Sequence, residues 1–251
     1  MRIASKRLVS LWVGAVSSLV LVAGAAAADY KMTSLDWPPY TGDKLPAMGV
    51  SSAVVAEAMK AAGHGLKVEF YQWSRTVNLA KSDPAYVAYF PEYHSKENAA
   101  DFLYSDPIGT GPLVLVERKA APVTWTTYDS LKGKKIGVVK DYVNTEELDA
   151  KIASKALTAD VAPDDAKNIL KLAAGRLDVA VVDVNVFHFL AKNDPSVKAV
   201  ADQLQVNAKT LEDKKLYVCF KKSPEGEAAL KAFNQGLKKV NVDDVMRKHF
   251  K

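Results

Sequence analysis

Short apolar runs alternate with helical patterns along the chain from residue 30 onward. The runs, each of strand length, cover residues 30–35, 66–70, 86–90, 111–118, 136–139, 177–182 and 216–222. Between them, apolar side chains recur at intervals of three and four residues, which is typical of amphipathic helices. Helices are expected from Gly49 to Gly63, over residues 74–81, after Thr145, after Asp164 and twice beyond residue 222. This alternation favours an α/β fold with largely parallel sheets.

Local signals sharpen several of these boundaries. Residues 37–40 (Trp-Pro-Pro-Tyr) form a rigid turn after the first strand. Asp164 is expected to cap a helix that Gly175 ends. Residues 119–130 are irregular and precede a new strand, so they mark a change of organisation in the middle of the chain.

The first 28 residues predict a signal peptide. Arg2, Lys6 and Arg7 precede an apolar run over residues 8–24, and four alanine residues follow at 25–28. The run is shorter than the about 20 residues needed to span a bilayer, although an uncleaved anchor is the alternative. No cysteine lies near the cleavage point before Asp29. We therefore expect export to the periplasm without a lipid anchor.

Charge and composition exclude several classes of protein. The formal net charge of +5 falls to +2 once the three cations of the predicted signal peptide are removed, and no basic stripe alternates with aromatic residues. We therefore expect no nucleic-acid partner. The four histidines lack metal-ligand spacing, and no phosphate loop or nucleophile elbow is present, so no metal or cofactor is expected. Cys219 lies in an apolar run and predicts a buried, unreactive thiol.

Several stretches resemble, in order, family 3 of the bacterial extracellular solute-binding proteins, best known as periplasmic amino-acid receptors. The aromatic-proline turn at 37–40 is similar to an early turn of that family. The Ser-Lys-Glu-Asn segment at 95–98 and the Tyr-Ser-Asp-Pro segment at 104–107 are similar to two further family segments. Residues 131–138 resemble the entry to the family's second lobe, and residues 174–183 resemble a strand that carries an aspartate into its cleft.

This resemblance implies a two-lobe periplasmic-binding-protein fold of type II. Each lobe would hold a mostly parallel sheet flanked by helices, and two strands, near 111–118 and 216–222, would cross between the lobes. The first lobe would comprise residues 29–115, completed by 216–251, and the second residues 116–215. Ligands of such α/β proteins bind in the cleft between the lobes.

The resemblance also implies which side chains contact the ligand. Trp37 and Trp73 match aromatic positions that sandwich the ligand, although both could instead belong to the lobe cores. Asp183 matches the aspartate that pairs with the ligand's ammonium group. A helix cap or a structural ion pair is the alternative for this acid.

Departures from the family pattern affect the carboxylate site. Asn98 stands where the family has an arginine that clamps the ligand carboxylate, and asparagine offers neither charge nor a bidentate fork. Phe90 and Tyr93 replace polar donors, and Asp141 with Tyr142 replaces a small glycine-threonine nest. Arg75 is a cation near Trp73 that could replace the clamp, or it could be a solvated residue on a helix face.

The resulting pocket is rich in aromatic rings and acids, which favours an amine, a quaternary ammonium or a polar uncharged solute. The candidate ligand-binding residues are Trp37, Tyr40, Trp73, Arg75, Phe90, Glu92, Tyr93, Asn98, Asp141, Tyr142 and Asp183. The leading interpretation is a monomeric, non-catalytic receptor that delivers a small amine-bearing or amino-acid-like solute to the membrane permease of an ABC importer. The alternatives are a dehydratase-like enzyme of the same fold, with Glu92 or Asp141 as proton donor, and a sensor that reports to a membrane receptor.

Overall fold

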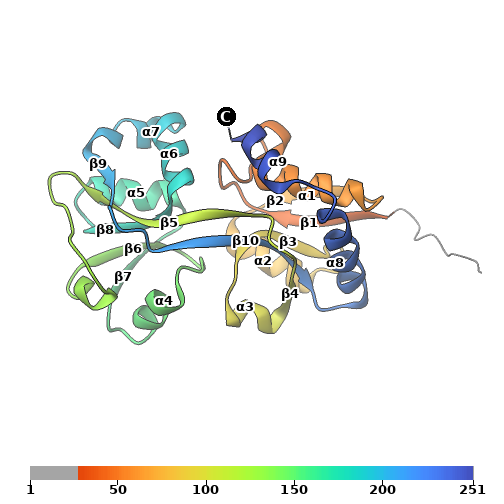
Figure 1. Ribbon diagram of the computed structural model, residues 1–251. Helices are drawn as coiled ribbons and strands as arrows, with labels where there is room; N and C mark the ends of the chain where they lie inside the picture. The colour runs from red at the N-terminus through yellow and green to blue at the C-terminus, as the bar shows by residue number, and fades with distance from the viewer. Residues whose placement is uncertain (1–27, 251) are drawn as a thin grey trace, which may run out of the picture.

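A computed structural model describes residues 28–250 of the chain. The predicted signal peptide lies, apart from its last residue, outside this part. The described strands form one mixed sheet with the order β2-β1-β3-β10-β5-β8-β6-β7 (Figure 1). The strands are β1 (Asp29–Ser34), β2 (Gly65–Phe70), β3 (Ala88–Tyr93), β4 (Phe102–Tyr104), β5 (Gly109–Arg118), β6 (Lys135–Val139), β7 (Thr158–Ala162), β8 (Val179–Asp183), β9 (Leu204–Val206) and β10 (Glu212–Lys221).

Two groups of parallel strands lie at the two ends of this sheet. Strand β1 pairs in parallel with β2 and β3, and β6 pairs in parallel with β7 and β8. Strands β5 and β10 run between the groups, antiparallel to each other and to the strands that they join (Figure 1). The predicted α/β fold with two crossing strands is confirmed. The whole sheet is mixed because the crossing strands are antiparallel.

Helices cover the sheet on both faces (Figure 1). They are α1 (Val50–Ala61), α2 (Trp73–Ser82), α3 (Lys96–Asp101), α4 (Glu146–Ala153), α5 (Asp165–Ala173), α6 (Val184–Asn193), α7 (Pro195–Lys198), α8 (Pro224–Leu237) and α9 (Val242–His249). In residues 28–250, no helix combines the length and the apolar character needed to cross a membrane.

Side-chain caps fix the helices that border the centre of the molecule. The Asp164 carboxylate accepts the backbone N–H of Lys167 at 2.7 Å, which confirms the predicted start of α5. Gly175 follows this helix with a positive φ of 72°, as the predicted stop requires. Thr145 caps α4 in the same way, accepting from the N–H of Leu148 at 3.2 Å.

The buried core continues from one strand group to the other along the crossing strands. Leu115 on β5 and Val218 on β10 are fully buried. Cys219 is also fully buried, and burial raises the pKa of its thiol well above the ordinary value. The prediction of a buried cysteine is therefore confirmed, and the raised pKa makes the thiol a poor nucleophile.

Candidate ligand-binding cleft

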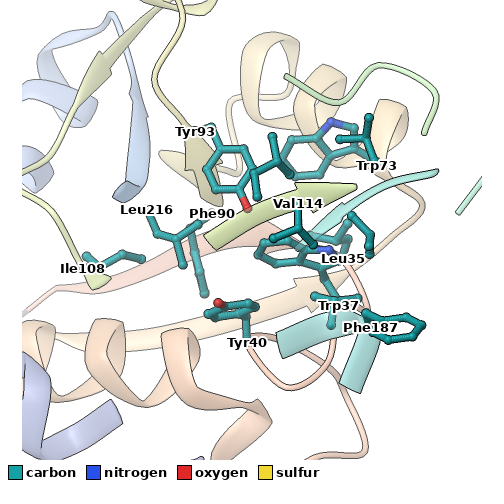
Figure 2. Packing of buried hydrophobic residues seen from close by; sticks show 14 of the residues in the cluster. Leu35, Trp37, Tyr40, Trp73, Phe90, Tyr93, Ile108, Val114, Phe187 and Leu216 are labelled. Atoms are coloured by element: carbon teal, nitrogen blue, oxygen red, sulfur yellow. The ribbon is translucent and has the colours of Figure 1, made fainter. Parts of the chain in front are cut away.

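Aromatic rings meet at the centre of the molecule, beside the crossing strands (Figure 2). Trp37 and Tyr40 come from the turn after β1, and their rings stack with centroids 4.6 Å apart. The ring of Tyr93, at the end of β3, meets Trp37 edge-on at 6.0 Å. Tyr142, which follows β6, meets Trp73 edge-on at 5.8 Å. The structure therefore brings these five sequence-predicted residues into one cluster.

The cluster leaves little free space. It surrounds a cavity of about 30 Å³, which is room for one or two water molecules. The lining residues are Leu35, Trp37, Trp73, Pro91, Glu92, Tyr93, Tyr142, Val143 and Leu216. Trp37 and Trp73 are 6% and 5% exposed, so both rings are packed in this conformation. A solute of amino-acid size enters this space only if the rings separate.

The indole N–H groups of Trp37 and Trp73 belong to residues that precede β5 in the chain, and both donate to residues that follow β5. The Trp37 Nε1 donates to the Asp165 carboxylate at 3.2 Å. The Trp73 Nε1 donates to the backbone carbonyl of Asp141 at 2.9 Å. The Ser74 hydroxyl adds a hydrogen bond to the Asp141 carboxylate. These bonds join segments that precede β5 to segments that follow it.

Asp183 caps a helix in this conformation. Its carboxylate accepts the backbone N–H groups of Asn185 at 2.8 Å and Val186 at 3.2 Å, at the start of α6. The hydroxyls of Tyr40 and Tyr93 donate to it at 3.1 and 3.3 Å. Burial raises the pKa of Asp183 to about 6, against the lowering effect of these hydrogen bonds. Four donors thus surround the carboxylate, and the helix-cap alternative describes its role here.

Asn98 is engaged by a neighbouring acid. Its amide donates to the Glu92 carboxylate at 2.8 Å, and that carboxylate also accepts the Tyr89 hydroxyl and the Tyr93 backbone N–H. Glu92 is 4% exposed, and burial raises its pKa to about 8, while the hydrogen bonds and the charge of Lys214 act in the opposite direction. The position of the family's carboxylate clamp therefore holds an asparagine paired with a carboxyl group.

Asp165 bonds to Trp37 and is not among the residues predicted from the sequence. It begins α5, one residue after the capping Asp164, and is 6% exposed. Burial and the nearby carboxylates of Asp183 and Asp164 raise its pKa to about 7. The paired aspartates were a signal for the helix start. Nothing local showed that the second one faces Trp37.

Phe90 and Arg75 belong neither to the aromatic cluster nor to the polar groups described around it. Phe90 is fully buried and packs in the core near Leu216 (Figure 2). Arg75 is exposed, and its guanidinium lies 4.8 Å from the ring centroid of Tyr71. Because Arg75 follows Trp73 by two residues on α2, the two side chains point to different sides of the helix. In this structure Arg75 is an exposed residue on the face of α2, and its role toward a solute stays a prediction.

A larger groove opens beside the small cavity. It has a volume of about 990 Å³ and shares Glu92, Tyr142 and Val143 with that cavity. Residues of α2, α3, the start of α4 and β10 line it, including the predicted residues Asn98 and Asp141. Lys214 of β10 also lines this groove and was not predicted.

Comparison with known proteins supports the fold. No family model matches the chain, and no curated protein sequence is similar to it. A histidine kinase sensor domain similar to periplasmic binding proteins shares 18% identity, with a TM-score of 0.74 over 88% of this chain and 95% of the other. An amino-acid ABC transporter substrate-binding protein from Streptococcus pneumoniae, bound to L-arginine, shares 18% identity, with a TM-score of 0.69 over 88% and 94%. The GluR0 ligand-binding core from Nostoc punctiforme, in complex with L-glutamate, shares 16% identity, with a TM-score of 0.69 over 88% and 97%. The chain therefore has the fold of the two-lobe periplasmic binding proteins, as its sequence predicted.

Proposed function

We propose that this protein is a solute-binding receptor whose two lobes close over a small polar, amine-bearing or amino-acid-like molecule. The lobes are residues 29–115 with 216–251, and residues 116–215. The observation that carries the proposal is the pair of indole hydrogen bonds, from Trp37 to Asp165 and from Trp73 to Asp141, because they join the two lobes across the cleft.

The connection between the lobes suits a hinge. Strands β5 and β10 join them, so relative motion is restricted to bending and twisting about these strands. A solute that contacts both lobes stabilises the closed form relative to the open form. In this proposal, the rings of Trp37, Trp73 and Tyr142 separate in the open form and close again around the solute.

The chemistry of the cleft favours a solute with a positive group. Aromatic faces attract cations, and Trp is the strongest of the aromatic side chains in this respect. The buried carboxyl groups of Glu92 and Asp165 lie beside these rings and provide acceptors for an ammonium group. The arginine-bound and glutamate-bound structures of the same fold support a solute of amino-acid size.

We propose that the receptor acts in the periplasm as a monomer and delivers its solute to the permease of an ABC importer, with no catalytic step. The transporter-associated protein from S. pneumoniae supports this assignment. The sensor domain of a histidine kinase, which has the same fold, supports signalling to a membrane receptor as a second candidate.

Native mass spectrometry of protein purified from its own periplasm tests the binding role. We expect a retained small molecule, and we expect X-ray scattering to show a larger radius of gyration once that molecule is removed by unfolding and refolding. If no molecule is retained, the refolded protein is titrated with the standard amino acids and with their decarboxylated amines. The absence of binding by every one of these compounds, with an unchanged radius, would refute the receptor function.

A further inference from the structure

Lys214 is a buried lysine on a strand that joins the lobes. Its side chain is 7% exposed, whereas the adjacent residues Asp213 and Lys215 are exposed. Side chains alternate between the two faces of a strand. Lys214 and Leu216 therefore lie on the same face of β10, where Leu216 lines the small cavity and Lys214 lines the groove.

The ammonium group of Lys214 has few partners. It lies 5.3 Å from the ring centroid of Tyr93 and 3.4 Å from the carboxylate of Glu212, whose side chain is 47% exposed. No hydrogen bond to this ammonium forms within residues 28–250. An ammonium carries three N–H donors. The partly exposed Glu212 carboxylate is the acid paired with this buried charge, and the ammonium has further donors that can bind an anionic group of a solute.

The nearest buried acids obtain their hydrogen bonds elsewhere. Glu92 accepts from the amide of Asn98 at 2.8 Å. Asp149 accepts the backbone N–H and the side-chain amide of Asn144 at 2.8 and 2.7 Å. The charge of Lys214 affects both acids, but neither forms a hydrogen bond with it. Apart from its ion pair with Glu212, the donors of Lys214 therefore remain available to a molecule in the groove.

The other lysines that line the groove are in different surroundings. Lys81, Lys96 and Lys215 are exposed. Lys81 pairs with Asp101 at 2.6 Å, and Lys96 pairs with Glu146 at 2.5 Å. Lys214 is thus the buried lysine among these four, and the carboxylate that it pairs with is the most distant, at 3.4 Å from its ammonium.

We propose that the ammonium of Lys214 binds the carboxylate of the solute, in place of the arginine that is missing at Asn98. This inference rests on the proposed receptor function. It implies that the solute is a zwitterion. The solute's carboxylate lies at β10, and its ammonium group lies toward the aromatic rings of the small cavity.

Isothermal titration calorimetry of the full mature chain tests this role. The probes are the standard amino acids, each paired with the amine that lacks its α-carboxylate, such as L-arginine with agmatine. Lys214→Met removes the buried charge. Lys215→Met removes an exposed charge one residue away and is the matched control.

We expect at least one amino acid to bind the wild type tenfold or more tightly than its amine, because hydrogen bonds between charged groups are roughly twice as strong as those between neutral groups. Lys214→Met should lower the affinity for that amino acid tenfold or more and change the affinity for the amine less than about threefold. Lys215→Met should change neither affinity. If Lys214→Met does not fold, as judged by circular dichroism, Lys214→Gln takes its place.

The outcomes separate the two proposals. Amines that bind as tightly as their amino acids, or an amino-acid affinity that survives loss of Lys214, would overturn the role of Lys214 and leave the receptor function intact. Failure of all amino acids and all amines to bind would overturn both.

Discussion

Replacing Glu92 with glutamine should remove part of the pH dependence of stability. Burial raises the pKa of Glu92 to about 8 from its ordinary value of 4.5, so the folded protein holds a proton that the unfolded chain releases between these values. Stability falls with rising pH wherever the folded state binds more protons. Glutamine has the same shape and does not titrate. Glu92→Gln should therefore become less sensitive to pH across this range.

The size of the effect follows from the three buried acids of the cleft. One additional proton in the folded state corresponds to a slope of about 1.4 kcal/mol per pH unit. Asp183 and Asp165, with pKa values raised to about 6 and about 7, contribute mainly below pH 7. Of these three acids, Glu92 contributes most between pH 7 and 8. Its ionisation should lower the unfolding free energy of the wild type by about 1 kcal/mol from pH 7 to pH 8.

Urea unfolding followed by tryptophan fluorescence at pH 5, 6, 7 and 8 measures this effect. The wild type should lose stability at each step. The unfolding free energy of Glu92→Gln should change little between pH 7 and 8. Glu57→Gln, which removes an exposed acid from α1, is the matched control and should follow the wild type. An equal loss of stability in wild type and Glu92→Gln between pH 7 and 8 would mean that Glu92 is already ionised at pH 7.

Three further substitutions probe the cleft. Asp183→Ala removes the cap of α6 and the carboxylate that accepts the hydroxyls of Tyr40 and Tyr93. It should lower the unfolding free energy in urea by about 2 kcal/mol or more; a loss below about 0.5 kcal/mol would contradict the capping role. Trp37→Phe keeps an aromatic ring but loses the hydrogen bond to Asp165. By X-ray scattering, the solute-free variant should therefore have a larger radius of gyration than the solute-free wild type, and equal radii would show that this bond does not favour the closed form. Trp73→Ala should cost about 3 kcal/mol or more because its ring is 5% exposed; a nearly unchanged unfolding midpoint would show that the ring is not packed.

The sequence was most informative where local rules decide the structure. The buried strands β6 and β8 are apolar runs, and the Asp164 cap and Gly175 define α5 through backbone chemistry within one or two turns. Strand β10 was predicted from residue 216 and begins at Glu212. Its first four residues are charged, which favours a loop, but pairing with β5 keeps them extended. Tertiary pairing thus outweighed local preference.

The candidate site was predictable only in part, because its hydrogen bonds join distant segments. The aromatic cluster was anticipated from Trp37 and Trp73, and the replacement at Asn98 was visible in the sequence. The bond from Trp37 to Asp165 joins residues far apart in the chain and has no local signature. Lys214 was missed for a related reason: a run of four charged residues resembles a solvated surface, and only the alternation of a crossing strand turns one of them inward.

The position of the cation matters for how a closing cleft responds to its solute. An arginine on α3 belongs to one lobe, so its bond to a carboxylate does not by itself report closure. With the proposed lobe bounds, Lys214 lies on β10 next to the boundary between the lobes, and its charge acts on Glu92 on one side of that boundary and on Asp149 on the other. A carboxylate at Lys214 would thus enter a field set by both lobes, and its binding energy would depend on how closely they approach. If both proposals hold, a zwitterion bound there would be coupled to closure through both charges. Its carboxylate would lie near the hinge, and its ammonium would lie between rings that the closed form brings together.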